Sequence, residues 1–125
     1  MIHSALNSDQ GWSRAGITFE PSPLSEASII FVIHDHWDKT EEVCRVSTDG
    51  CVKREAHLCK VVLLETSLSH QGYATSLINH EMVHCLGLPH GKDGLMKYAD
   101  KNNIYPNESD IARIHTLRER LHSPN

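Results

Sequence analysis

Two short runs of apolar residues stand out in an otherwise polar chain. Residues 28–34 (SIIFVIH) and 59–66 (CKVVLLET) are rich in β-branched residues, which is typical of strands buried on both faces. We expect the first run to be the central strand of a small sheet. Residues 17–19 alternate like a weak third strand before Pro21 and Pro23 interrupt the pattern.

Two later segments have apolar residues at helical spacing. Residues 73–86 form the first, and Gly87 follows as a residue that adopts a left-handed conformation without steric cost. We therefore predict a helix that ends at Gly87. Residues 107–122 form the second, and Asn107 and Asp110 stand in the N-cap and N3 relation that favours a helix start.

The intervening segments give weaker signals. Residues 8–15 predict a short helix capped by Ser8, although Gly11 weakens it. Residues 35–57 are polar and aperiodic, which indicates a long surface excursion, and an edge strand could lie within it.

The chain has 125 residues, enough for one compact domain but too few for two. We expect a single domain, 1–125, with an N-terminal part of about 1–87 and a C-terminal part of about 88–125.

Composition excludes several functional classes. Hydrophobic residues make up 39% and charged residues 22%, as in ordinary globular proteins. The net charge is −4 and the basic residues are scattered, so we expect no nucleic-acid partner. No apolar run approaches the roughly 18 residues that span a membrane, and the first residues lack the order of a signal peptide. We expect no membrane partner and a monomeric protein.

Four cysteines bear on the compartment in which the protein works. Cys44 and Cys51 flank the turn-like residues 47–50, which predicts a local disulfide and favours a secreted or extracytoplasmic location. The alternative is four reduced, partly buried thiols. None of the four has the CxxC spacing of a structural zinc site. We expect Cys85 to be a small core residue that faces the sheet rather than a reactive thiol.

The strongest chemical signal is the run of residues 80–90 (HEMVHCLGLPH). Residues four apart lie on one face of a helix, so His80 and His84 can present ring nitrogens to one metal ion. Gly87 lets the chain turn sharply, so that His90 can return as a third ligand. Glu81 is rotated around the helix, which places its carboxylate near the open side of the metal.

This ligand set suits a catalytic zinc ion. Three neutral imidazoles leave one zinc position for water, whose pKa the ion lowers to near neutrality. Glu81 can take the proton as that water attacks a carbonyl and then pass it to the leaving amine. Composition alone would give the full pattern in roughly one chain of this length in 4,000.

The pattern resembles the signature of the metzincin clan, HExxHxxGxxH followed by a methionine-bearing turn. Met96 is the natural candidate for that turn, although the connection from His90 is short. Met96-Lys97-Tyr98 is similar to the Met-x-Tyr arrangement of astacins and serralysins. That likeness implies that Tyr98 could steady the oxyanion, and the alternative is a ring packed at the domain edge.

The resemblance extends more loosely to the rest of the chain. Residues 105–114 are similar to the start of the closing helix of matrixins, and residues 11–19 to the opening of small bacterial metzincin-like domains. It implies an α+β fold in which a short mixed sheet packs on the active-site helix, with a small C-terminal part ending in a helix. The first helix and full sheet of typical relatives have little room before Ile29, and Met82-Val83 replaces their small glycine.

The sequence therefore predicts a zinc metalloendopeptidase that acts on extended polypeptide, and the resemblance to metzincins implies that the substrate lies along an edge strand. One alternative is a non-catalytic, zinc-stabilised binding domain, and another is a zinc amidase that acts on a non-protein substrate. His34, Asp35, His36 and Asp38 could offer a second metal site. Charged residues at the end of a strand are more often a solvated edge.

Overall fold

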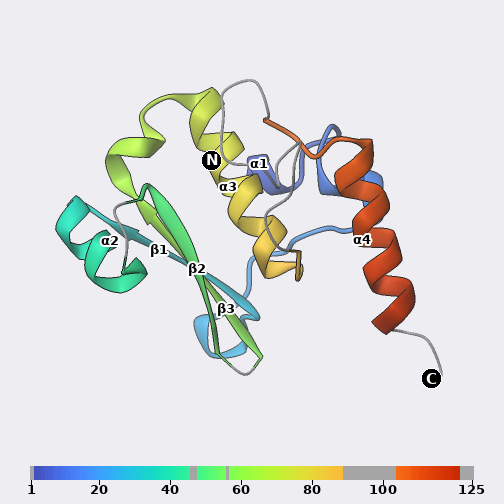
Figure 1. Ribbon diagram of the computed structural model, residues 1–125, viewed down its shortest axis with the longest axis horizontal. Coiled ribbons are helices and arrows are strands. Elements are labelled where there is room, and N and C mark those ends of the chain that lie inside the picture. Colours follow the sequence, from blue (N-terminus) through green and yellow to red (C-terminus); the bar gives the residue numbers. More distant parts are fainter. Residues whose placement is uncertain (1, 46–47, 56, 89–103, 122–125) are drawn as a thin grey trace.

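The computed structural model describes residues 2–45, 48–55, 57–88 and 104–121 of the chain. Its helices are α1 (Ile2–Leu6), α2 (Trp37–Cys44), α3 (Gln71–Cys85) and α4 (Glu108–Leu121), and its 3-10 turns are η1 (Trp12–Ala15), η2 (Leu24–Glu26) and η3 (Glu65–Leu68). The strands are β1 (Ile29–His34), β2 (Gly50–Glu55) and β3 (Leu58–Leu64), which form one mixed sheet. The predicted α+β class is confirmed (Figure 1).

The sheet has the order β1-β3-β2, so β3 is its central strand. β3 runs parallel to β1 and antiparallel to β2, and Val61, Val62 and Leu63 are fully buried. The prediction that residues 28–34 form the central strand is wrong. β1 pairs on one side only, its residues are half-buried, and Ile33 is 46% exposed. Both runs are mainly apolar, and this pattern does not encode strand order.

The polar segment between β1 and β3 is more ordered than its sequence indicates. It contains α2 and also β2, which is the edge strand that the sequence allowed. His36 begins α2, because its ring accepts a hydrogen bond from the backbone N–H of Asp38. The long excursion predicted for residues 35–57 is therefore a helix and a strand joined by a short connection.

The N-terminal elements also differ from expectation. Residues 17–19 form no strand, and the helix expected over residues 8–15 is replaced by α1 and by η1. Gly11 separates the two and is buried so closely that a Cβ there would lie 3.3 Å from the Ser8 carbonyl oxygen. The glycine that weakened the predicted helix thus marks the point where the chain turns.

Helices cover both faces of the sheet. Side chains alternate between faces along a strand, so Val61 and Leu63 point toward α3, whereas Cys51 and Val62 point toward α2. Gly50 lies on the α3 face, where a Cβ would come within 2.9 Å of the Val62 carbonyl oxygen. α3 lies between the sheet and α4 (Figure 1).

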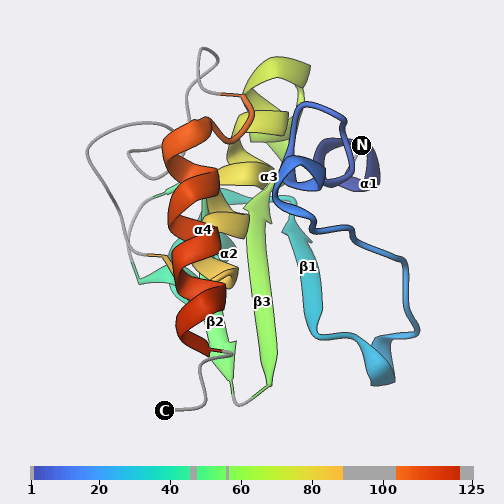
Figure 2. The same cartoon turned by 90° about the vertical axis from the view of Figure 1, so that its right-hand side faces the viewer.

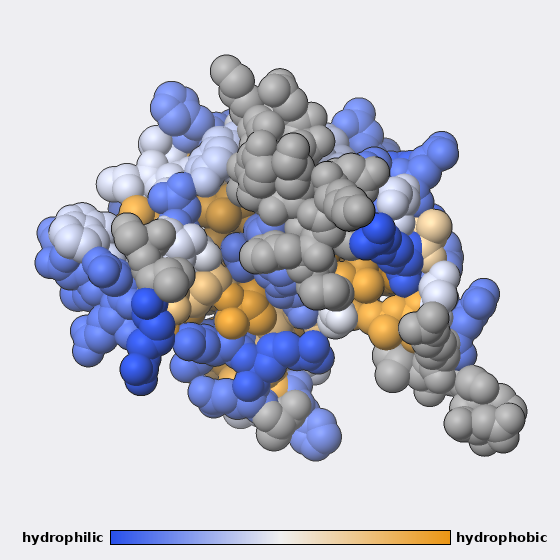
Figure 3. Space-filling model, in the orientation of Figure 1, coloured by the Kyte–Doolittle hydropathy of each residue, from blue (hydrophilic) through white to orange (hydrophobic). Residues whose placement is uncertain are grey.

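α3 is the centre of the molecule. Every residue from 74 to 83 is buried, because the sheet, the N-terminal segment and α4 surround the helix (Figure 2). Trp12 is fully buried against it and belongs to the core cluster around this helix. On the face shown in Figure 3, apolar residues reach the surface between the sheet and α4, with hydrophilic residues on either side.

The start of α4 follows the predicted capping pattern. The Asn107 backbone N–H donates to Asp110 Oδ2 at 2.9 Å, and the Asp110 N–H donates to Asn107 Oδ1 at 2.8 Å. These reciprocal bonds satisfy two groups that a helix start would otherwise leave without partners. Ile114, one turn later, is buried in the core cluster around α3.

All four cysteines are paired. Cys44–Cys51 joins α2 to β2 and confirms the predicted local disulfide. Cys59–Cys85 joins β3 to α3, so Cys85 packs against the core and faces the sheet as expected, but it does so in a disulfide that the sequence did not predict. The alternative of four reduced thiols is likewise contradicted. None of the described helices is long and apolar enough to cross a membrane.

The two disulfides should differ in their effect on stability. The chain-entropy relation gives about 3.5 kcal/mol for Cys59–Cys85 and about 2.5 kcal/mol for Cys44–Cys51, because the first closes a longer loop. Urea unfolding of the two paired Cys→Ser variants measures both losses. Equal losses, or a larger loss for the Cys44–Cys51 pair, would contradict this ranking.

Candidate metal centre

The end of α3 fixes the geometry of the candidate site. Gly87 has φ +99°, the Leu88 N–H donates to the Val83 carbonyl at 3.1 Å, and the Gly87 N–H donates to the His84 carbonyl at 3.0 Å. These bonds form a Schellman motif, so the helix ends as the sequence predicts. A Cβ at Gly87 would also lie 3.1 Å from Leu117 Cδ2, and α4 therefore leaves little room for a larger residue.

The imidazole rings of His80 and His84 lie side by side on this last part of the helix. Their centroids are 5.0 Å apart and their planes are at 87°. Two imidazoles that share one tetrahedral zinc ion through bonds of 2.0–2.1 Å have centroids about 5 Å apart. The pair that the sequence brings to one face therefore has a separation that fits a shared ion.

A backbone carbonyl orients the second histidine. His84 Nδ1 lies 2.9 Å from the Leu88 carbonyl oxygen. A carbonyl only accepts, so Nδ1 carries the hydrogen and the neutral ring has its lone pair on Nε2. Metal-binding histidines typically have such a bond on the other ring nitrogen, because it fixes the tautomer and the ring orientation.

Glu81 lies beside this pair and is almost completely buried. The residue is 4% exposed, and burial raises the pKa of its carboxyl from 4.5 to about 7. No hydrogen bond or ion pair to this carboxyl occurs within the described part of the chain. A carboxylate with a pKa near neutrality suits a general base at physiological pH.

A tyrosine and an aspartate that the sequence does not single out lie near Glu81. The Tyr73 hydroxyl donates to Asp49 Oδ2 at 2.5 Å and ties α3 to the residue before β2. Burial, the Asp49 carboxylate and the Glu81 carboxylate raise the pKa of Tyr73, so its phenol stays neutral. Only the fold brings Asp49 to this helix, since 24 positions separate it from Tyr73.

Asn79, directly before the first histidine, joins three parts of the molecule. Its Oδ1 accepts from Trp12 Nε1 at 3.1 Å, and its Nδ2 donates to the Ile104 carbonyl at 2.8 Å. Trp12 and Asn79 are both fully buried. These bonds hold the turn that carries His80 against η1 and against the segment that leads to α4.

Three predicted site residues, His90, Met96 and Tyr98, lie outside the described residues. Within residues 2–45, 48–55, 57–88 and 104–121, no three histidine, cysteine, aspartate or glutamate side chains come together as a metal site. The second site suggested around His36 therefore does not form there. Instead, His36 caps α2 and Asp35 pairs with Lys39 at 3.2 Å.

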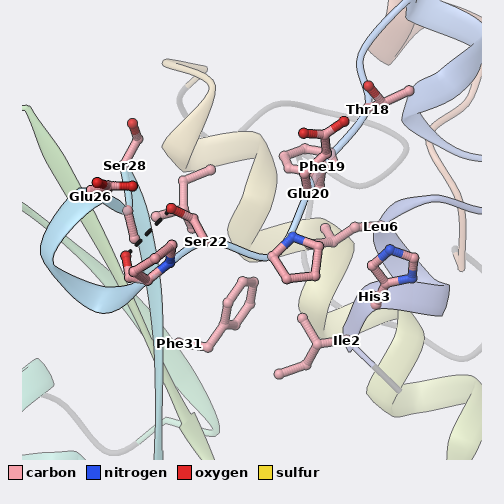
Figure 4. A pocket seen from close by; sticks show the side chains of 14 residues that line it. Ile2, His3, Leu6, Thr18, Phe19, Glu20, Ser22, Glu26, Ser28 and Phe31 are labelled. Atoms are coloured by element: carbon pink, nitrogen blue, oxygen red, sulfur yellow. Dashed lines mark hydrogen bonds between the residues drawn. The ribbon is translucent and has the colours of Figure 1, made fainter.

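A separate pocket of about 840 Å³ lies on the other side of the molecule, between α1, residues 18–28 and the start of β1. Figure 4 shows Ile2, Leu6, Phe19 and Phe31 pointing toward it, with carboxylates at its rim. Of the predicted site residues that the structure describes, His80, Glu81 and His84, none lines this pocket. The candidate chemistry therefore belongs to the end of α3.

No protein-family model, curated protein or solved structure matches the chain.

Burial of Glu81 makes a pH-dependent prediction. Below pH 4.5 the carboxyl is protonated in the folded and unfolded states, whereas above pH 7 the folded protein holds a buried charge. Metal-free wild type should lose about 3 kcal/mol of unfolding free energy relative to Glu81→Gln as the pH rises through this window.

Urea titrations of chelator-treated protein at pH 4 and pH 8 measure this difference, and the exposed Glu65→Gln is the matched control. Equal pH dependence of Glu81→Gln and wild type would contradict the burial argument.

Proposed function

We propose that this chain is a zinc-dependent endopeptidase of the metzincin type. His80, His84 and His90 hold the metal, and Glu81 is the general base. One observation carries the proposal: two imidazoles lie 5.0 Å apart on a helix in which the residue directly after His80 is the buried Glu81. The glycine turn that follows, with its left-handed Gly87, supports the same assignment.

The sheet supports an extended polypeptide as substrate. β2 is an outer strand, antiparallel to β3, and it packs against α3. In the metzincins that the sequence resembles, the substrate lies antiparallel to an edge strand above the metal. Pairing with an outer strand uses backbone hydrogen bonds, so it tolerates many sequences.

Different residues of the chain have different roles in the proposed peptide hydrolysis. When bound, zinc lowers the pKa of a water molecule and polarises the substrate carbonyl. Glu81 removes the proton from the attacking water and delivers it to the leaving amine nitrogen. The Leu88 carbonyl keeps the His84 ring in the tautomer that binds metal through Nε2.

Burial of Glu81 favours this proposal over a non-catalytic zinc domain. An ionised carboxylate that is buried without a partner destabilises the folded protein, and a structural zinc site gains nothing from it. A zinc amidase on a non-protein substrate would use the same residues. Digestion of a denatured protein distinguishes the two activities.

We propose a secreted or extracytoplasmic monomer. The two disulfides are compatible with an oxidising compartment.

The first test concerns the metal. Purified protein should hold one zinc ion, and His84→Ala should release it because a tetrahedral site loses one of three protein ligands. Elemental analysis after dialysis gives the stoichiometry, and His115→Ala, on the exposed side of α4, is the control. Full zinc occupancy in His84→Ala would refute the ligand assignment.

The second test concerns the base. Glu81→Gln preserves the size of the side chain but removes the proton acceptor, so peptide cleavage should fall by at least about 10²–10⁴-fold when both proteins are saturated with zinc. Cleavage of a denatured protein, followed with and without chelator, measures this loss. Equal cleavage by Glu81→Gln and wild type would show that the mechanism is wrong.

A further inference from the structure

Arg54 lies on the outer strand β2, on the face of the sheet that packs against α3. Val52 packs against the core around α3, and alternation along β2 puts Arg54 on the same face. Arg54 is paired with Cys59, whose disulfide to Cys85 reaches the last residue of α3. The register of the sheet therefore places Arg54 near the C-terminal end of α3, where the candidate site lies.

The guanidinium of Arg54 lies next to the turn that follows the second histidine. Its Nη1 is 3.9 Å from the position that a Cβ would take at Gly87. Gly87 comes three residues after His84, and the neighbouring Leu88 carbonyl binds the His84 ring. The positive charge is thus close to the candidate metal centre but is not part of it.

No carboxylate partner for Arg54 occurs among the described residues. Among these residues, the ion pair between a basic and an acidic side chain is Lys39–Asp35, which lies at the start of α2. Arg14 and Arg118 donate to backbone carbonyls, whereas Arg54 is exposed and makes no hydrogen bond within that part of the chain. A guanidinium has a planar set of donors that matches a carboxylate in a two-point bond.

We propose that Arg54 is a specificity-determining residue that binds a carboxylate of the substrate. This inference rests on the proposed peptidase function and names its substrate class: extended peptides with a negative charge close to the cleaved bond. The carboxylate comes from an aspartate or glutamate side chain or from the C-terminus of the peptide. Both sources offer the same two oxygens to the guanidinium.

The experiment compares peptides that differ at one position near the cleaved bond, which is Glu, Gln or Lys, all with amidated C-termini. A fourth peptide, with Gln at that position and a free C-terminus, tests the other source of the carboxylate. We expect kcat/KM for one of the two carboxylate sources to exceed that for the amidated Gln peptide by roughly ten- to a hundredfold, the range for a hydrogen-bonded charge. Arg54→Glu should abolish this preference and favour the Lys peptide.

Lys53→Glu is the matched control, because it makes the same charge change on the opposite face of β2. Its preference should remain that of the wild type, and thermal unfolding confirms that each variant is folded. Equal kcat/KM for all four peptides in the wild type would overturn the inference. A carboxylate preference that persists in Arg54→Glu would also overturn it.

A binding assay separates this inference from the peptidase proposal. Fluorescence anisotropy measures the affinity of labelled Glu, Gln and free-C-terminus peptides for the zinc-loaded Glu81→Gln variant, with and without Arg54→Glu. If the wild type cleaves nothing but a carboxylate peptide binds through Arg54, the carboxylate site stands and the peptidase proposal fails. If neither carboxylate peptide binds more tightly than the amidated Gln peptide, the inference on Arg54 fails.

Discussion

Burial of α3 on all sides is the constraint on which the rest of this structure depends. A helix in such a position cannot leave polar side chains without partners, because burying an unpaired polar group costs free energy. Asn79 meets this requirement through Trp12 and the Ile104 carbonyl. Glu81 is the contrasting case, since burial alone raises its pKa and no described residue compensates it. The proposed role of Glu81 as a general base would account for a buried acid at this position of the helix.

Covalent and backbone constraints converge on the last turn of the same helix. The Cys59–Cys85 disulfide attaches it to the central strand, and the turn at Gly87 returns the chain so that the Leu88 carbonyl reaches the His84 ring. Each constraint acts within four residues of His84. The orientation of this ring is therefore set by the scaffold, which reduces the freedom that a ligand loses when it binds a metal.

Local patterns could be predicted from the sequence, and long-range partners could not. The α3 and α4 helices, the Asn107–Asp110 cap and the pairing of His80 with His84 follow from spacing along one helix. Strand order failed because two equally apolar runs give no sign of which has two neighbours. The Cys59–Cys85 disulfide and the contacts of Tyr73 and Asn79 join positions 24 to 67 residues apart, so only the fold reveals them.

A bound divalent cation would couple the buried acid electrostatically to the paired imidazoles. A divalent cation shared by His80 and His84 would favour the ionised form of Glu81, since an opposite charge nearby lowers the pKa of a carboxyl. By linkage, the ionised carboxylate would in turn increase the affinity of the site for the cation. Cation binding would therefore relieve the destabilisation that the buried charge causes in the metal-free protein near neutral pH. The free-energy cost of the buried Glu81 charge and the affinity of the site for the metal would therefore both depend on the same interaction between carboxylate and cation.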